Sequence, residues 1–339
     1  MNKNILPCAL ALSTLSAVAA PAPAPAPAPA PSPGAEFAAP HRLVDIGGRR
    51  LNLFCSGSGS PTVVFESPSG GAGWDWWTVQ PKVAAKTRAC IYDRAGYGFS
   101  DPSPRAADAS NAVDDLHALL KAAGIAPPYV LVGNSFGGAA AQLFAWTHPD
   151  EVQGLVLVEP MHEDELVRPD ALTHGAITDG ERQVVEFGNA CAAQAAKGFA
   201  PKSEAYEDCI GGTDPSLPAA VGAIGLEQRL APAWWRVRQA ERVSLAADRE
   251  ELRAARKPFG DLPVVVLVRG VSPYLIPGKP QGDTNKAIEA ANLELLTGIA
   301  NSSTRGAARV VPGAGHVIQE TDPGAVVAAV DEVLGKISR

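Results

Sequence analysis

A serine with a glycine two positions to either side is the residue best suited to chemistry in this sequence. Ser135 lies in the pattern Gly133-x-Ser135-x-Gly137, directly after the apolar run Tyr129–Val132 and before a helical pattern. A turn this tight between a strand and a helix leaves no room for side chains beside its apex, so it presents the serine hydroxyl above the sheet. We therefore predict that Ser135 is a nucleophile rather than part of an ordinary Ser-Gly turn.

A serine hydroxyl is a weak nucleophile at neutral pH and needs a general base, which a carboxylate in turn orients. Six histidines are candidates for this base. His117 falls within a helical pattern, and His148 precedes a proline at a helix end. His316 instead follows the strand-like run Ala308–Val311 in a loop with two glycines, which allow the backbone to bring the imidazole over the sheet edge. We predict His316 as the base.

Short apolar runs alternate with helical patterns along the chain, which predicts an α/β fold with a mostly parallel sheet. The runs that we expect to form strands are Leu51–Phe54, Thr62–Glu66, Ala89–Tyr92, Tyr129–Val132, Leu155–Glu159, Val264–Val268 and Ala308–Val311. Helical patterns cover residues 112–123, 139–147 and 324–337, and Gly124 is the expected stop of the first. Residues 162–257 contain no convincing strand, so we predict a helical insertion there.

The N-terminal residues are typical of an export signal followed by a spacer. Lys3 precedes an apolar run of small residues that ends near Ala17-Val18-Ala19, so we predict a signal peptide over residues 1–19. The alternative is an uncleaved signal anchor. Ala and Pro alternate from Pro21 to Pro31, so we predict an extended linker over residues 20–36. We expect a periplasmic or secreted protein, of a bacterial envelope, without stable membrane insertion after cleavage.

Composition limits the partners. The chain has 339 residues, a formal net charge of −7, 46% hydrophobic residues and 19% charged residues, which is typical of a globular protein. No run of Lys or Arg is present, so nucleic acid is not an expected partner. A small-molecule substrate is expected instead.

The cysteines agree with an oxidising compartment. Beyond Cys8, four remain at Cys55, Cys90, Cys191 and Cys209, and their spacing matches no zinc pattern. An even number in an exported protein favours two disulfides, with four buried free thiols as the alternative. Spacing alone leaves three connectivities open.

Taken together, these motifs resemble those of the α/β-hydrolases over nearly the whole chain beyond residue 40. The matching segments are Tyr92–Asp101, Gly133–Gly138, His148–Val158 and Gly313–His316. The resemblance implies the α/β-hydrolase fold, a mostly parallel central sheet flanked by helices, with Ser135 as nucleophile and His316 as base. It also implies a core of residues 37–160 and 259–339 and a helical cap of residues 161–258.

The resemblance also implies a disulfide pairing. The order of strands in the family places the strand holding Cys55 beside the one holding Cys90. Cys191 and Cys209 both fall within the implied cap, where a local bridge would close a loop of ordinary size. We therefore expect Cys55–Cys90 and Cys191–Cys209.

The acid of the catalytic triad departs from the common family pattern. Many members carry an Asp a few residues after the strand that matches Val264–Val268, but here no carboxylate follows until Asp283. A known variant places the acid at the end of the preceding strand, where this chain has Glu159. We predict Glu159 as the acid, with Asp283 as the alternative.

The loop expected to stabilise an oxyanion also departs from the family, which usually has His-Gly there. The segment Glu66–Gly73 contains Pro68, which has no N–H to donate. We predict the backbone N–H groups of Phe136 and Ser69 as donors, with Gly70 as the alternative to Ser69.

Other features have structural explanations. Asn134 is expected to pack beside the serine turn, and Asp93 with Arg94 to fix the turn after their strand. We expect Trp74, Trp76 and Trp77 to bury apolar area rather than to wall a substrate pocket. His162–Glu165 is expected to be a solvated loop, since it lacks metal-ligand spacing.

These observations predict an exported serine hydrolase that cleaves esters through an acyl-enzyme intermediate, with no cofactor and no metal. Relatives that open epoxides or remove halides use an Asp nucleophile, and Ser135 argues against both reactions. The alternatives are an aminopeptidase, acyltransferase or lactonase of the same fold, or a ligand-binding protein without activity.

Overall fold

The computed structural model describes residues 32–276 and 278–337. The predicted signal peptide, residues 1–19, and most of the predicted linker, residues 20–36, lie outside the described residues. Residues 33–339 form one unit. Its first element is the 3-10 turn η1 (Ala35–Ala38), which buries Phe37 against Phe54 with ring centroids 5.4 Å apart. The last residues assigned to the linker are therefore part of the folded unit.

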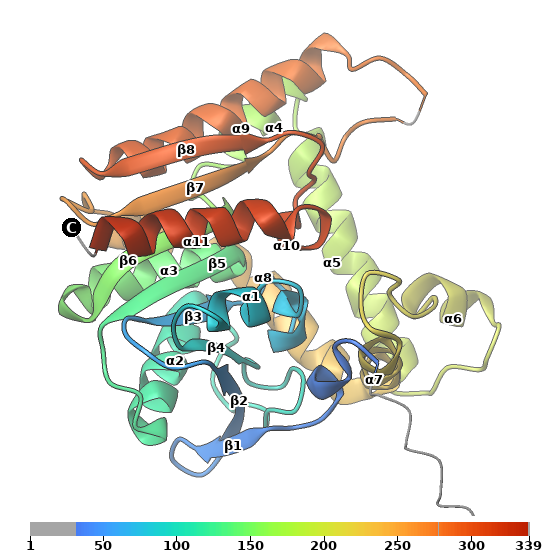
Figure 1. Cartoon of the computed structure of the whole chain (residues 1–339). Helices are drawn as coiled ribbons and strands as arrows, with labels where there is room; N and C mark the ends of the chain where they lie inside the picture. The colour runs from blue at the N-terminus through green and yellow to red at the C-terminus, as the bar shows by residue number, and fades with distance from the viewer. Residues whose placement is uncertain (1–31, 277, 338–339) are drawn as a thin grey trace, which may run out of the picture. The chain divides into compact units, whose positions relative to one another are not determined.

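The described residues form an eight-stranded sheet with the order β1-β2-β4-β3-β5-β6-β7-β8 (Figure 1). The strands are β1 (Arg42–Asp45), β2 (Arg50–Ser56), β3 (Thr62–Glu66), β4 (Ala89–Tyr92), β5 (Tyr129–Ser135), β6 (Val152–Pro160), β7 (Val264–Arg269) and β8 (Gly306–Val311). β2 pairs antiparallel with β1 and β4, and every other pair is parallel. The predicted α/β fold with a mostly parallel sheet is confirmed.

Helices cover both faces of the sheet, because the central strands are apolar on both sides. Val64 packs in a cluster with residues of α2 (Ala109–Ala123), α3 (Phe136–Thr147) and α9 (Asp283–Asn301). The neighbouring Val63 points the other way, into a cluster with α1 (Gln80–Ala84) and α11 (Pro323–Ile337). The remaining short turns outside the inserted segment are η2 (Gly73–Trp76), η3 (Pro149–Glu151) and α10 (Ile318–Thr321).

A helical segment joins β6 to β7, as the sequence predicts, and we refer to residues 161–258 as the cap segment. It contains α4 (Val167–Leu172), α5 (Ala176–Ala195), α6 (Glu204–Cys209), α7 (Ala219–Leu230) and α8 (Pro232–Ala255). The chain leaves β8 and enters α10 at one end of the sheet. α5 and α7 lie beyond this same end (Figure 1). α8 packs against α2 and α3. Among the described residues, no helix has both the length and the apolarity of a membrane span.

The structure contains two disulfides, in the pairing that the resemblance implies. Cys55 and Cys90 are partners in the register of β2 and β4, and a disulfide joins them. Cys191 at the end of α5 is joined to Cys209 at the end of α6. One bridge therefore fastens an edge of the sheet, and the other closes the outer part of the cap segment.

Two elements escaped the sequence patterns for physical reasons. β1 exposes three of its four residues, so it carries no apolar run. α9 begins at Asp283, because Gly282 adopts an extended conformation before it. Asp283, the alternative candidate for the acid, is therefore the first residue of this surface helix.

Candidate active site

Ser135 occupies a strained position between β5 and α3. Its backbone has φ 54° and ψ −119°, which residues other than glycine rarely adopt. A Cβ on Gly133 would lie 2.2 Å from the Gly137 carbonyl oxygen, and one on Gly137 would lie 2.4 Å from the Glu66 carbonyl oxygen. Both flanking positions therefore require glycine, and the turn holds the serine at the first residue before α3.

Phe136 begins α3, so its backbone N–H belongs to the first helical turn, where N–H groups have no partner within the helix. An oxyanion bound at Ser135 would meet this helix N-terminus, where partial positive charge favours an anion. The structure therefore leaves the Phe136 N–H in a suitable position for the predicted role.

The two candidate donors in the loop after β3 differ in their partners. The Gly70 N–H donates to Oε1 of Glu241 on α8 at 2.8 Å. The Ser69 hydroxyl accepts a hydrogen bond from Nη1 of Arg238 at 2.6 Å, whereas its backbone N–H makes no hydrogen bond within the described residues. The geometry therefore favours the Ser69 N–H over that of Gly70 as a donor to substrate.

The fold brings together His316 and Glu159, which are 157 residues apart in the sequence. His316 lies in the loop between β8 and α10, and its Nδ1 is 3.4 Å from Oε2 of Glu159 near the end of β6. The side chain of His316 is 44% exposed and that of Glu159 is 2% exposed. Glu159 also has a positive φ of 44°, a second strained residue at this edge. The imidazole thus faces solvent on one side and a buried carboxylate on the other.

Glu159 is held by more than the histidine. Arg269, the last residue of β7, donates its backbone N–H to Oε1 and its Nη1 to Oε2, both at 2.7 Å. Asn292 Nδ2 donates to Oε1 at 3.3 Å. Burial works to raise the pKa of Glu159, but the hydrogen bond with His316 and the charge and N–H of Arg269 outweigh it and lower the pKa. Glu159 is therefore a carboxylate at neutral pH.

Asp283 does not reach His316. Its side chain is fully exposed at the start of α9 and pairs with Nζ of Lys286 at 3.1 Å. The segment after β7, where many relatives carry the acid, holds the histidine loop through its backbone instead. The N–H groups of Gly270 and Val271 both donate to the Ala314 carbonyl at 2.9 Å.

Asn134 does more than the packing that the sequence predicts. It is fully buried, and its Nδ2 donates to the carbonyls of Val158 at 2.8 Å and His316 at 3.1 Å. Its Oδ1 accepts from Nε2 of Gln319 at 3.1 Å. The residue before Ser135 therefore fixes the backbone of the residue predicted as the base.

Arg94 links the predicted oxyanion loop to the cap segment. Its guanidinium donates to the carbonyls of Ser67 at 2.5 Å and Pro68 at 2.8 Å, and pairs with Oε2 of Glu241 at 3.0 Å. It also lies 4.8 Å from the centre of the Phe136 ring. The sequence predicts that Asp93 and Arg94 together fix the turn after β4. In the structure Asp93 does so, because its carboxylate accepts hydrogen bonds from the backbone N–H groups of Gly73 and Phe99. Arg94 instead positions both elements that carry the predicted donors.

Another buried carboxyl, Glu66, lies directly before this loop. Burial raises its pKa to about 7, although the charge of Arg94 and a hydrogen bond from the Tyr92 hydroxyl at 2.7 Å oppose the shift. Glu66 therefore exchanges its proton near neutral pH, at the end of β3.

Replacing Glu241 by glutamine is expected to lower the free energy of unfolding by about 3 kcal/mol, because the buried guanidinium of Arg94 loses its counter-ion. We also expect kcat/KM to fall, since Arg94 and Gly70 are no longer held in place. Urea unfolding with the disulfides intact measures the first effect. The matched control is Glu250→Gln on the same helix, whose side chain is 74% exposed. It should change stability by less than about 0.5 kcal/mol, and an equal loss in both variants would contradict the role of Glu241.

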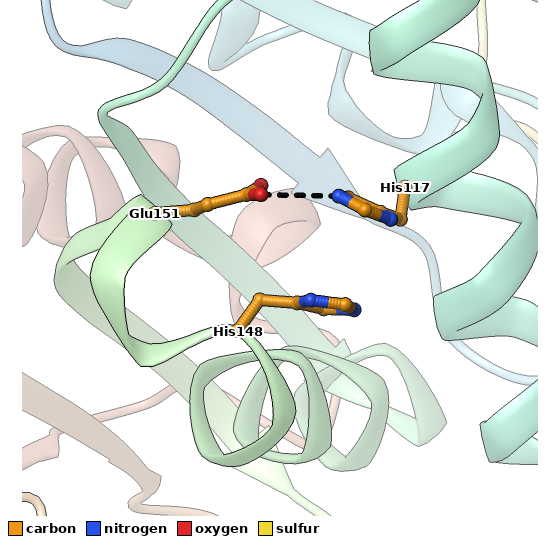
Figure 2. A group of neighbouring side chains, drawn as sticks. All are labelled: His117, His148 and Glu151. Atoms are coloured by element: carbon orange, nitrogen blue, oxygen red, sulfur yellow. Dashed lines mark hydrogen bonds and ion pairs between the residues drawn. The ribbon is translucent and has the colours of Figure 1, made fainter.

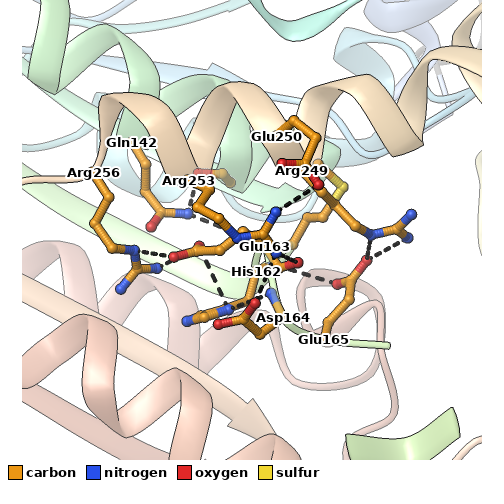
Figure 3. A network of polar contacts seen from close by, with 11 residues as sticks. Gln142, His162, Glu163, Asp164, Glu165, Arg249, Glu250, Arg253 and Arg256 are labelled. Atoms are coloured by element: carbon orange, nitrogen blue, oxygen red, sulfur yellow. Dashed lines mark hydrogen bonds and ion pairs between the residues drawn. The ribbon is translucent and has the colours of Figure 1, made fainter. Parts of the chain in front are cut away.

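The His162–Glu165 segment is not the solvated loop that the sequence predicts. His162 and Glu163 are buried, and arginines of α8 reach across to the segment (Figure 3). Arg256 Nη2 donates to Glu163 Oε2 at 2.7 Å, Arg253 pairs with Asp164 at 2.8 Å, and Arg249 pairs with Glu165 at 2.7 Å. The acidic residues therefore fasten the last turns of α8 to the end of β6.

A cavity of about 320 Å³ lies under α8. Its walls come from the loop after β4, the start of α2, Phe136 and one face of α8, with Val237 and Ala240 among the residues on α8. Phe136 follows Ser135 directly, but neither Ser135 nor His316 lines the cavity. Trp74 and Trp76 are buried in the core on the other face of the sheet, as expected of residues that bury area.

Residues 61–191 match the model of a protein family described by the alpha/beta hydrolase fold. The matched range contains β3 to β6, with Ser135 and Glu159, and the strand order of the whole sheet agrees with it. The chain therefore has the α/β-hydrolase fold.

Proteins of similar sequence include a hydrolase and an uncharacterized protein. The chain is 37% identical over 132 residues to 2-hydroxymuconate semialdehyde hydrolase of Pseudomonas sp. (strain CF600). The matched segment covers 35% of this chain and 45% of that protein. The chain is also 30% identical over 119 residues to the uncharacterized protein YbdG of Bacillus subtilis. That matched segment covers 34% of this chain and 37% of YbdG. The matched segments thus span less than half the length of these curated relatives.

Solved structures show the same fold over most of the chain. A thermophilic esterase from Thermogutta terrifontis superposes with a TM-score of 0.55 and 20% identity, over 85% of this chain and 94% of the esterase. The epoxide hydrolase CorEH superposes with a TM-score of 0.62 and 16% identity, over 87% of this chain and 97% of that structure. At these identities the likeness concerns the fold.

Proposed function

We propose that this α/β-hydrolase is an exported serine esterase with Ser135 as nucleophile, His316 as general base and Glu159 as the orienting acid. The observation that carries the proposal is the contact between the buried Glu159 carboxylate and Nδ1 of His316 at 3.4 Å. Glu159 precedes Pro160, the last residue of β6, and Pro160 pairs in register with Ser135 at the end of the neighbouring strand β5. The three residue types therefore gather at one edge of the sheet.

In the first half of the reaction, Ser135 Oγ attacks the ester carbonyl while Nε2 of His316 accepts the hydroxyl proton. Glu159 stabilises the resulting imidazolium through Nδ1 and remains ionised itself. The N–H groups of Phe136 and Ser69 are the proposed donors to the carbonyl oxygen as it becomes negative. His316 then gives its proton to the leaving alcohol, which departs and leaves an acyl group on Ser135.

In the second half, His316 removes a proton from water, which attacks the acyl carbon. The acid leaves as Ser135 regains its proton from the imidazolium. Every proton transferred in the two halves passes through Nε2 of His316, which is neutral again at the end of the cycle. The names of the similar esterase and of 2-hydroxymuconate semialdehyde hydrolase agree with hydrolysis as the reaction class.

Export is part of the same proposal. The leader-like residues 1–19 and the two disulfides support an oxidising destination such as the periplasm or the medium. Mass spectrometry of the secreted protein, with and without reduction, tests both the cleavage site and the bridges.

The bond type is tested with purified mature protein and a panel of p-nitrophenyl esters of increasing acyl length, together with aminoacyl amides and lactones. We expect turnover of esters and covalent labelling by a fluorophosphonate probe. Turnover of amides or lactones alone would replace the esterase by an aminopeptidase or a lactonase. A folded protein that neither turns over nor becomes labelled would be a ligand-binding protein instead.

The cavity under α8 is our proposed site for the acyl chain, because its wall at Phe136 adjoins the nucleophile. Ala240→Phe fills part of this cavity from α8, so kcat/KM for an octanoate ester should fall roughly tenfold while that for acetate stays within about twofold. Ala247→Phe is the matched control, since Ala247 is exposed on the same helix and does not line the cavity. An equal effect on both esters would contradict the assignment.

A further inference from the structure

Two histidines and a glutamate form a cluster that the proposed reaction does not use. His117 lies on α2, His148 directly follows α3, and Glu151 ends η3. The three side chains converge from these separate elements (Figure 2). His148 follows the last residue of α3 and Ser135 precedes the first, so roughly 18 Å of helix separates this cluster from the nucleophile.

The donor atoms lie close enough to share an ion. One ligand atom from each residue falls within 4.8 Å of the others, and Nε2 of His117 is 3.1 Å from Oε1 of Glu151. The rings of His117 and His148 are stacked, with centroids 4.1 Å apart and planes 21° apart. The ligands of a tetrahedral zinc ion are about 3.3 Å from one another. The three donors therefore lie close to the spacing of a zinc site, and the stacked rings would have to rotate for both of their nitrogens to face one ion.

The pairing of these residues also suits a metal. Neither ring nitrogen of His148 makes a hydrogen bond within the described residues, and no lysine or arginine there pairs with Glu151. The cluster thus offers two imidazoles and a carboxylate that no lysine or arginine of the described residues pairs with.

A second cluster with similar ligand types shows the contrast. His162, Glu163 and Asp164 also place their ligand atoms within 4.8 Å of one another. There, however, Arg256 and Arg253 pair with the two carboxylates (Figure 3). Guanidinium groups already supply the positive charge at that cluster, whereas no arginine or lysine of the described residues pairs with Glu151.

We propose that His117, His148 and Glu151 bind one Zn²⁺ ion, whose fourth position is open to solvent because all three residues are only partly buried. The proposal departs from the sequence-based expectation of no metal. The ion would tie the end of α3 to α2 and η3. Its role is therefore structural, since the other end of α3 carries the predicted oxyanion donor.

Isothermal titration of tag-free, disulfide-intact protein with ZnCl₂ tests the proposal. We expect one equivalent to bind with a Kd of about 10 µM or lower, and the thermal transition to rise with zinc. His148→Gln and Glu151→Gln should each weaken binding at least roughly tenfold. His174→Gln, which changes an exposed histidine of the cap segment, is the matched control and should bind as the unchanged protein does.

Two further measurements keep the test decisive. His316→Gln reports zinc bound at the proposed catalytic histidine, and loss of the single equivalent in this variant alone would overturn the proposal. X-ray absorption of the zinc-loaded, unchanged protein should show two imidazole ligands, whatever the stability of the variants. Absence of binding below about 100 µM, or binding that His148→Gln leaves unchanged, would also overturn it.

Discussion

Replacement of Ser135 by alanine is expected to lower kcat for ester hydrolysis by about 10⁵-fold and to abolish labelling by a fluorophosphonate probe. The change removes one oxygen atom, so the attacking group is lost while α3 and the donors around it stay in place. Alanine at a φ of 54° keeps the strain that serine has, and we expect little change in the thermal transition. Initial rates and gel-based labelling measure both effects.

Ser110→Ala is the matched control, because Ser110 is exposed on α2 and its hydroxyl donates to Glu251. It should be labelled and active like the unchanged protein. Labelling that persists in Ser135→Ala would place the nucleophile elsewhere and refute the proposed mechanism.

The second large effect is expected at the acid. Glu159→Gln should lower kcat by about 10³–10⁴-fold, because an amide does not stabilise the imidazolium and does not hold the required tautomer. Asp283→Asn should remain within about twofold, since Asp283 is exposed and pairs only with Lys286. Steady-state kinetics on one ester separates the two variants.

Arg269 provides a check on the structure of the acid variant. It keeps its ion pair with Glu289, at 2.9 Å, when Glu159 becomes neutral. Circular dichroism and thermal unfolding should therefore show a folded protein. Loss of activity in Asp283→Asn, with Glu159→Gln active, would reverse the assignment of the acid.

The signals that single out Ser135 and His316 in the sequence are local. The tight turn requires glycine at positions 133 and 137, and the loop of His316 has glycines on either side of Ala314, so a short stretch of sequence contains each pattern. The fold class was predictable for a similar reason, since buried parallel strands are apolar on both faces. These features depend on neighbours in sequence.

Residues that act across the fold carried no such signal. Glu241 accepts a hydrogen bond from Gly70, which is 171 residues away in the sequence. From the sequence alone, a glutamate on an arginine-rich helix is expected to be solvent-exposed, because its partner is not known. The arginines of α8 likewise meet His162–Glu165 only after the cap segment folds back. The role of Asn134 depends on the His316 loop, 182 residues away.

The choice between Glu159 and Asp283 shows the same limit. Both carboxylates are compatible with the sequence, but only the strand order places the end of β6 beside the end of β7. His117 and His148 were both set aside as candidate bases, and their stacking follows from the packing of α2 on α3.

The disulfide in the outer cap bears on how this protein withstands proteases. Cys191 and Cys209 enclose an exposed stretch that includes Lys197 and Lys202, two sites at which trypsin cuts. A cut at either lysine leaves the two ends covalently joined. The nicked chain would then run as one piece on a denaturing gel until a reductant is added, and the helices on both sides of the break would stay attached.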